Sequence, residues 1–478
     1  MSGAKVLKMF ALNMLPFSDA GSETLPLRQL LRLSLFQVSV GMAAVMMLGT
    51  LNRVMIVELG LSALLVASMI ALPVLIAPFR ALLGFKSDTY RSAIGWKRIP
   101  YLWFGTLWQF GGLAIMPFAL LILGGYDVIV IPYAGEAFAA LAFLMTGLGM
   151  HMTQTAGLAL AADRATDETR PRVVALLYVA FLAGMLVSSL LIGFLLRDFD
   201  GVRLIQVVQG TAVATVILNV IALWKQESLR PTTKEERATP SPRFAAAWAD
   251  LSEGGTAGRL LLAVFLGTMA FNMQDVLLEP YGGEILGLSV SSTTLLTASW
   301  AVGALVAFGL AARWLAQGIN PTRMAARGIL SGIAAFSAVI FASPLDSAPL
   351  FFAGALGIGF GGGLFAVATL TTAMTLPTGI AGRGLALGAW GAAQATAQGL
   401  STAMGGGIRD SVNALATSGA LGEALNSPAT GYSVVYHLEI GLLFLTLVAL
   451  GPLVSLTDRP ATRPEPKEAR IGLADFPT

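Results

Sequence analysis

The sequence predicts an all-α polytopic membrane protein with twelve transmembrane helices. Its 478 residues are 55% hydrophobic and only 12% charged, which is more apolar surface than a soluble core can bury. Twelve apolar stretches are each long enough to cross a hydrocarbon layer of about 30 Å as a helix. They are residues 34–57, 61–84, 101–124, 131–161, 173–196, 204–224, 259–279, 292–316, 323–342, 348–376, 384–407 and 433–456.

The basic residues predict the orientation of these helices. All but four of the 30 Lys and Arg residues lie in the termini or in every second connection between spans. The exceptions are Arg53, Arg197, Arg203 and Arg409. By the positive-inside rule both termini are cytoplasmic. The net charge of +3 therefore reflects topology, and no nucleic-acid partner is expected.

The longest basic connection divides the chain. Residues 225–258 are rich in proline and charge and separate six spans from six, which predicts a cytoplasmic linker between two bundles, 34–224 and 259–456. Residues 1–33 are expected to form a cytoplasmic leader and residues 457–478 a cytoplasmic tail. No cleavable signal peptide is expected, because the first strongly apolar run begins near Ser34.

The residue types exclude several kinds of chemistry. The chain has no cysteine, which rules out disulfides, thiol catalysis and Cys-bound metals. No nucleophile–base constellation or phosphate-binding loop appears in the sequence, so we do not expect an enzyme.

The connection after the second span carries a recognisable pattern. Gly84 and Asp88, followed by the run 95–98 (GWKR), resemble the signature loop of the major facilitator superfamily, although this loop is a few residues longer. The resemblance implies two six-helix bundles related by a pseudo-twofold axis along the membrane normal. It also implies a cytoplasmic charge latch between helix ends, formed here by Asp88, Arg91, Lys97 and Arg98.

Other stretches are more specific. They are residues 51–60 (LNRVMIVELG), 78–88 (PFRALLGFKSD), 273–283 (MQDVLLEPYGG) and 432–441 (YSVVYHLEIG). Together they resemble the PucC/LhaA family, also called the bacteriochlorophyll delivery family, over nearly the whole chain, and they favour its core-antenna LhaA branch. The resemblance implies an assembly factor of the bacterial inner (intracytoplasmic) membrane that binds bacteriochlorophyll and delivers it to light-harvesting antenna polypeptides. The machinery of bacteriochlorophyll synthesis would be a further partner.

A bacteriochlorophyll needs a ligand for its magnesium, and oxygen or imidazole nitrogen suits that ion. His151 lies inside the fourth span, with Gln154 and Thr155 on the same helix face. A polar stripe in a membrane helix is expected to face the bundle interior, so His151 is the candidate magnesium ligand. The alternative is that His151 only forms hydrogen bonds to a neighbouring helix.

Spans ten and eleven are rich in glycine. The glycines either let helix backbones approach closely, or leave a flat slot for a macrocycle or form a hinge for rocking of the helices. In the second case Trp300, Phe360 and Trp390 would pack on the pigment ring, whereas in the first they are ordinary packing residues.

Charged residues near the outer ends of spans one and seven suggest a gate. The superfamily fold brings these helices together, and we predict an ion pair between Arg53 and Asp275, shared with Glu58 or Glu279, that keeps the outer side closed. The alternative is two independent interfacial charges.

Two other functions stay open from the sequence. One is secondary transport of a small solute, which the lack of an acid at mid-depth in spans one, four and ten disfavours for proton coupling. The other is a pigment-free scaffold for antenna helices. The fold alone does not separate these functions.

Overall fold

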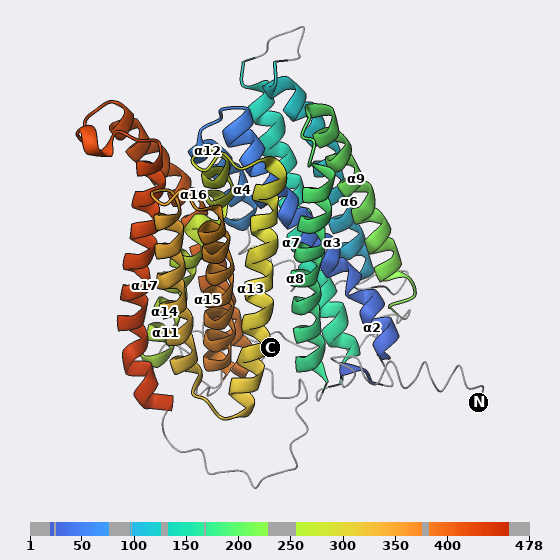
Figure 1. Cartoon of the computed structure of the whole chain (residues 1–478). Coiled ribbons are helices and arrows are strands. Elements are labelled where there is room, and N and C mark those ends of the chain that lie inside the picture. The colour runs from blue at the N-terminus through green and yellow to red at the C-terminus, as the bar shows by residue number, and fades with distance from the viewer. Residues whose placement is uncertain are drawn as a thin grey trace.

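The computed structural model describes residues 20–22, 25–75, 96, 98–125, 132–166, 169–227, 255–374 and 382–457. Within these residues all regular structure is helical, and the helices stand side by side (Figure 1). Much of the predicted leader, the linker and the tail lies outside the described residues, so the predicted domain boundaries stay predictions.

The part before the linker forms one group of helices. It contains α2 (Leu27–Leu33), α3 (Leu35–Ala44), the π-helical segments η2 (Val45–Leu51) and η3 (Val54–Glu58), α4 (Ala63–Leu75), α6 (Ile99–Leu123), α7 (Ala134–Arg164), α8 (Arg170–Leu195) and α9 (Gly201–Leu223). Prolines begin α6 and α8, where a missing backbone N–H costs no hydrogen bond.

The part after the linker forms a second group. It contains α11 (Thr256–Asn272), the 3₁₀ segment η4 (Met273–Val276), α12 (Leu278–Glu284), α13 (Val290–Ala316), α14 (Pro321–Ala342), α15 (Ala348–Met374), α16 (Gly382–Thr417), the 3₁₀ segment η5 (Glu423–Leu425) and α17 (Ala429–Thr457). Ser289 caps α13 and Asn320 caps α14, each accepting a hydrogen bond from a backbone N–H of the first turn.

The membrane class predicted from the sequence is confirmed. Among the described residues, nine helical runs are long and apolar enough to cross a membrane. Three more helices stand beside them: α4, described for 13 residues, and the long helices α7 and α16, with 31 and 36 residues, which are rich in Gly, Ala, Thr and Gln. The exact number of twelve spans stays a prediction.

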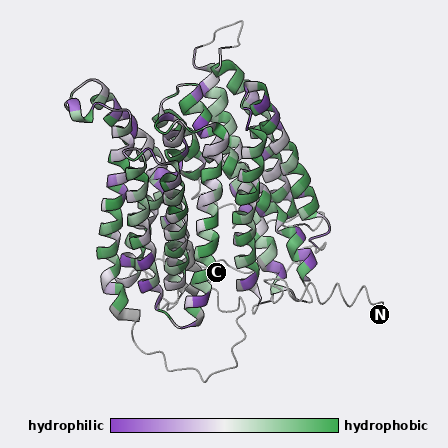
Figure 2. Cartoon of the chain, viewed as in Figure 1, coloured by the Kyte–Doolittle hydropathy of each residue, from purple (hydrophilic) through white to green (hydrophobic). Residues whose placement is uncertain are grey.

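The outer surface of the bundle is apolar. Phe118, Phe194 and Val448 are 61%, 63% and 73% exposed, which would be costly for large side chains in water. Hydrophobic residues run along the helices, while hydrophilic ones gather toward the helix ends (Figure 2). Such a surface suits acyl chains as solvent.

The two groups meet along two pairs of helices. α4 packs against α16, and α8 packs against α13. We call the end of the bundle that carries α12 the distal end, which is uppermost in Figure 1, and the opposite end, where α6 and α11 begin, the proximal end. The charge pattern predicts that the distal end is periplasmic.

Candidate functional site: a closed distal end, an interrupted helix and a membrane-facing groove

Hydrogen bonds between the two groups of helices gather toward the distal end. Thr50 and Thr294 hydroxyls lie 3.2 Å apart, the Leu64 amide donates to Asp410 at 2.6 Å, and Ser291 donates to the Gly193 carbonyl at 2.5 Å. Each joins a residue before the linker to one after it. The distal end is therefore closed by direct contacts between the two groups.

An interrupted helix takes part in this closure. α11 ends at Asn272, a 3₁₀ turn follows, and α12 resumes at Leu278. Pro280 has no N–H to donate to the Val276 carbonyl four residues earlier, so a regular helix leaves that carbonyl without a donor. Here Asn52 Nδ2 donates to Val276 O at 2.9 Å. A polar side chain of the first span thus holds the break of the seventh.

Arg53 occupies the same region but does not pair with Asp275, so that part of the predicted gate is wrong among the described residues. Its guanidinium forms an ion pair with Glu58 and donates to the Leu288 carbonyl at 3.2 Å. It also attracts Glu279, which accepts a hydrogen bond from Thr297 at 2.5 Å. Asp275 instead accepts from its neighbour Gln274 at 2.6 Å. The predicted sharing of Arg53 with Glu58 is therefore present, while the predicted pair with Asp275 is not.

A second charged group, absent from the predictions, surrounds Arg409. Arg409 is 7% exposed and forms ion pairs with Glu284 and, at 2.8 Å, with Asp410. It also lies over the ring of Tyr432, whose hydroxyl donates to Glu284 at 2.6 Å. This network ties α12, α16 and α17 together and presents Asp410 to α4.

The candidate pigment residues of the fourth span lie in the first group of helices. His151, Gln154 and Thr155 are all partly buried on α7. Gln154 Nε2 lies 3.4 Å from Gln37 Oε1 on α3, and Thr155 donates to the His151 carbonyl at 2.7 Å. Their polar face thus meets α3, and the role of His151 as a magnesium ligand stays a prediction.

The aromatic candidates lie in the second group. Trp300 on α13, Phe360 on α15 and Trp390 on α16 are partly buried, and Trp390 Nε1 donates to Thr369 at 3.2 Å.

The glycines of α15 support the packing alternative. A Cβ at Gly361 would lie 2.6 Å from the Gly328 carbonyl, and one at Gly354 would lie 2.6 Å from a methyl of Val339. Helices α14 and α15 therefore touch through their backbones at these positions. These glycines therefore do not line a flat slot for a macrocycle.

Of the predicted charge latch, Asp88, Arg91 and Lys97 lie outside the described residues. Arg98 is 6% exposed at the start of α6, and its Nε donates to Asp163 of α7 at 3.0 Å. Glu227, just after α9, accepts from the backbone amides of Arg98 and Ile99 at 3.0–3.1 Å. A carboxylate at a helix N-terminus is favourable, so this cluster fixes three proximal helix ends.

Arg164 extends this proximal cluster. It forms hydrogen bonds with Gln226 and, at 2.6 Å, with Gln29. Burial, and then the nearby charge of Arg32, lowers the pKa of Arg164 from its ordinary value. Since an arginine pKa starts far above neutrality, the side chain stays charged.

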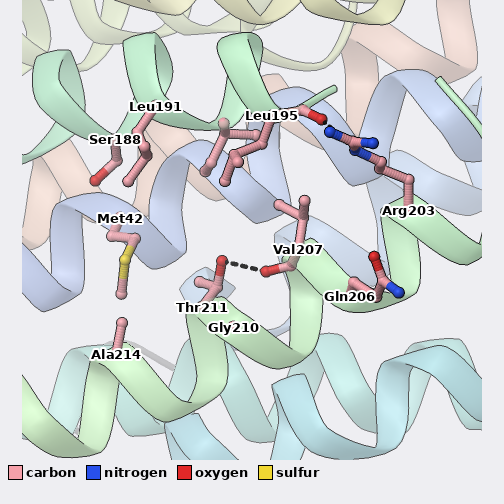
Figure 3. Close-up of a pocket in the computed structure, with 11 residues that line it drawn as sticks. Met42, Ser188, Leu191, Leu195, Arg203, Gln206, Val207, Gly210, Thr211 and Ala214 are labelled. Carbon is pink, nitrogen blue, oxygen red and sulfur yellow. Dashed lines mark hydrogen bonds between the residues drawn. The ribbon is translucent and has the colours of Figure 1, made fainter. Parts of the chain in front are cut away.

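A groove of about 530 Å³ lies between α3, α8 and α9, and Figure 3 shows the residues that line it. Leu191 and Leu195 of α8, Met42 of α3 and Val207 of α9 supply apolar walls. Leu191 is 55% exposed, so the groove faces the bilayer.

Polar side chains occupy one end of this groove. Arg203 and Gln206 are exposed at the distal end of α9, and Arg203 Nε donates to the Leu195 carbonyl at 2.9 Å. Thr211 donates to the Val207 carbonyl within α9 (Figure 3). The groove thus offers apolar walls below a cationic edge, a composition suited to an amphipathic, lipid-soluble molecule.

Besides the Arg409 network, two features were not predicted from the sequence. The groove combines residues of three helices whose relative rotation is not encoded in local hydropathy. Glu439 is fully buried in α17. The sequence does indicate this residue, because it is a single acid inside a long apolar span.

Comparison with known proteins identifies the family. A family model described as "PUCC protein" matches residues 50–457. A Rhodobacter capsulatus protein named "Uncharacterized protein in puhA-bchM intergenic region" is 63% identical over 474 residues, covering 99% of each chain. "Protein PucC" of Rhodovulum sulfidophilum is 53% identical, covering 83% of this chain and 88% of that protein. "Bacteriochlorophyll synthase 44.5 kDa chain" of R. capsulatus is 29% identical, covering 81% and 88%.

Solved transporter structures share the fold. A bacterial homolog of the human lysosomal transporter Spinster, in an inward-facing conformation, superposes with a TM-score of 0.66 at 14% identity, covering 91% of this chain and 98% of its own. The D-xylose-proton symporter gives 0.63 at 16% identity, covering 87% and 96%. These likenesses confirm the predicted major facilitator fold, and the family model together with the close relatives shows that this chain belongs to the PucC protein family.

Proposed function

We propose that this chain is a non-enzymatic factor of the bacterial inner membrane that binds bacteriochlorophyll and delivers it to light-harvesting antenna polypeptides. The observation that carries the proposal is the family match along residues 50–457. The names of two relatives point the same way, since one refers to bacteriochlorophyll synthesis and another to the puhA-bchM region.

The groove supports a route for such a pigment. Bacteriochlorophyll is lipid-soluble, so it is expected to enter from the bilayer and not from water. The groove between α3, α8 and α9 opens sideways to the membrane, while direct contacts close the distal end. A pigment taken up from the membrane could then be passed sideways to an antenna helix without crossing the bilayer.

We propose His151 as the ligand of the pigment magnesium, with Gln154 and Thr155 beside it. Neutral imidazole suits this role, and a polar face inside a membrane helix is costly unless it serves a function. The aromatic residues Trp300, Phe360 and Trp390 belong to the other group of helices, so they would contact the ring only if the two groups come together around it.

Near-infrared absorption of the purified protein tests the proposal. The chain is isolated in mild detergent from a pigment-synthesising strain without antenna polypeptides, beside His151→Ala and the control His437→Ala, whose side chain is exposed. We expect a bound bacteriochlorophyll band that His151→Ala removes and His437→Ala keeps. A folded, colourless wild-type protein would contradict pigment binding, and a band that persists in His151→Ala would contradict this ligand.

Secondary transport of a small solute is the second candidate. It is favoured by the fold shared with solved transporters. Transport requires the distal contacts to open. A variant in which a covalent cross-link holds the two groups of helices together at the distal end is therefore expected to lose transport. Pigment uptake from the bilayer in such a locked chain would instead favour delivery, and a locked chain that still gathers antenna polypeptides without pigment would favour a scaffold.

A further inference from the structure

Glu439 is buried without a neutralising partner. It is 0% exposed in the middle of α17, where its Oε1 accepts the backbone N–H of Gln274 at 2.7 Å. Its Oε2 has no hydrogen-bond donor among the described residues. An ionised carboxylate in such a place is costly unless another positive charge compensates it.

The residues that contact Glu439 and lie beside it carry further oxygen atoms. Asp275, partly buried in η4, carries a second carboxyl group whose charge acts repulsively on Glu439. Gln274 is 2% exposed, and its Oε1 also has no donor among the described residues. Its Nε2 is already used by Asp275 and by the Phe271 carbonyl. Two carboxyl groups and one amide oxygen are thus linked through Gln274, with acceptors in excess of donors.

The interrupted helix adds to this negative character. α11 ends at Asn272, two residues before Gln274 and three before Asp275, and the C-terminal end of a helix carries a partial negative charge from its last carbonyls. Unwound backbone beside a carboxylate is the arrangement in which membrane transport proteins hold small cations. The break was explained above by Pro280, so it does not depend on the carboxyl groups.

No described basic residue neutralises the pair. Of the helices packed against α17, α16 contributes Arg409, which is engaged by Glu284 and Asp410. α14 carries Arg323 and Arg327 near its proximal start, and Arg327 lies over Trp314. α11 carries only the exposed Arg259 at its start.

The remaining titratable groups near Glu439 are aromatic or acidic. On α17 itself, Tyr436 is fully buried one turn away, with a hydroxyl that has no described partner, while His437 is exposed and bonds to the Ser433 carbonyl. From α12, Tyr281 packs edge-on against the ring of Tyr436. Asp275 is therefore the charged group that acts on Glu439, and it has the same sign.

We propose that Glu439, Asp275 and Gln274 bind one monovalent cation, either a proton or Na⁺. Both would supply the positive charge that the three oxygen-bearing side chains lack. The site lies in the α11–η4–α12 segment, which Asn52 ties to the first group of helices through Val276. Cation binding therefore stabilises the closed distal end, and its loss favours opening. This inference is independent of pigment binding.

Thermal unfolding in lipid nanodiscs tests the site with pigment-free protein. Melting temperature is measured over a series of NaCl concentrations, with choline chloride holding the ionic strength, and over a pH series without Na⁺. The variants are Glu439→Gln and Asp275→Asn, and the control is Glu423→Gln, which removes an exposed acid of η5. Equilibrium binding of radioactive sodium and the infrared carbonyl band of protonated carboxyl groups are recorded on the same samples.

Two results support the proposal and identify the cation. If Na⁺ is bound, the melting temperature rises to a plateau with increasing Na⁺ concentration and does not rise with choline. Each chain then retains one Na⁺, and Glu439→Gln weakens the affinity for Na⁺ at least about tenfold. If the proton is bound, Na⁺ has no effect, melting temperature falls as pH rises, and Glu439→Gln removes both this slope and a protonated-carboxyl band. Glu423→Gln changes neither.

The proposal is overturned if the unaltered chain shows neither sodium retention nor a protonated-carboxyl band. It is also overturned if the dependence that the unaltered chain shows, on Na⁺ or on pH, persists in both Glu439→Gln and Asp275→Asn. Should a variant fail to accumulate, the two measurements on the unaltered chain still decide the question.

Discussion

Arg409 shows how a membrane protein holds a buried positive charge. Two carboxylates and a tyrosine ring surround its guanidinium, so each partner offsets part of the cost of removing the charge from water. Removing the arginine leaves Glu284 and Asp410 facing each other without a cation. Because both acids keep some solvent access, the penalty is smaller than for a fully enclosed pair.

We therefore expect Arg409→Gln to lower the free energy of unfolding by about 2 kcal/mol. Thermal and denaturant unfolding in detergent micelles, followed by tryptophan fluorescence, measures this. The control Arg259→Gln removes an exposed arginine at the opposite end of the bundle and is expected to change stability by less than about 0.5 kcal/mol. Equal effects of the two substitutions would contradict the network.

The partner of Arg53 can be tested by double-mutant cycles. We expect Arg53→Gln and Glu58→Gln to be coupled by about 1 kcal/mol, because the two side chains form an ion pair. Arg53→Gln and Asp275→Asn should add within about 0.5 kcal/mol, because Asp275 bonds to Gln274 instead. Coupling to Asp275 that exceeds coupling to Glu58 would restore the pair predicted from the sequence.

Between helices, α14 and α15 approach each other through glycine. Gly361 and Gly328 face each other so closely that no Cβ fits without movement of a backbone. Such contacts replace the hydrophobic effect, which gives no attraction between helices already surrounded by lipid. They also explain why glycine-rich spans need not indicate a ligand.

We expect Gly361→Ala to destabilise the protein by about 1–3 kcal/mol, because the added methyl would force α14 and α15 apart. Gly391→Ala on α16 is the matched control, since a Cβ there meets no atom within 4 Å. That substitution should be neutral or stabilising by up to about 1 kcal/mol through helix propensity. The fraction of protein that stays folded after heating is measured for both variants by fluorescence-detected size-exclusion chromatography. Equal stability of Gly361→Ala and Gly391→Ala would argue that the backbones are not in contact.

At the scale of the whole molecule, the closure of the distal end can be tested with introduced cysteines, because the sequence contains no native cysteine. We expect Thr50→Cys with Thr294→Cys to form a disulfide on mild oxidation in membranes, because the two hydroxyls lie 3.2 Å apart. Each single variant serves as the control and should form no intramolecular bridge. Two reactive thiols that label readily but never bridge would show that the distal end is open in the membrane.

Orientation is a separate prediction for the complete chain. A cysteine at Gly60, in the distal turn between η3 and α4, should react with an impermeant maleimide added from the periplasmic side. One at Gly255, beside the linker, should react only after the membrane is permeabilised. The opposite pattern would reverse the topology that the positive-inside rule predicts.

The sequence predicted the class of fold, the approximate positions of most helices and the family. These predictions rest on hydropathy, on the alternation of basic residues and on contiguous motifs such as residues 273–283, all of which are properties of residues close together in the chain. The contacts that side chains make with their partners could not be predicted in the same way. Arg53 was expected to pair with Asp275, shared with Glu58 or Glu279; it pairs with Glu58, whereas Asp275 accepts a hydrogen bond from Gln274. The groove, the Arg409 network and the isolation of Glu439 likewise depend on how distant helices rotate and pack, which local patterns of polarity do not specify.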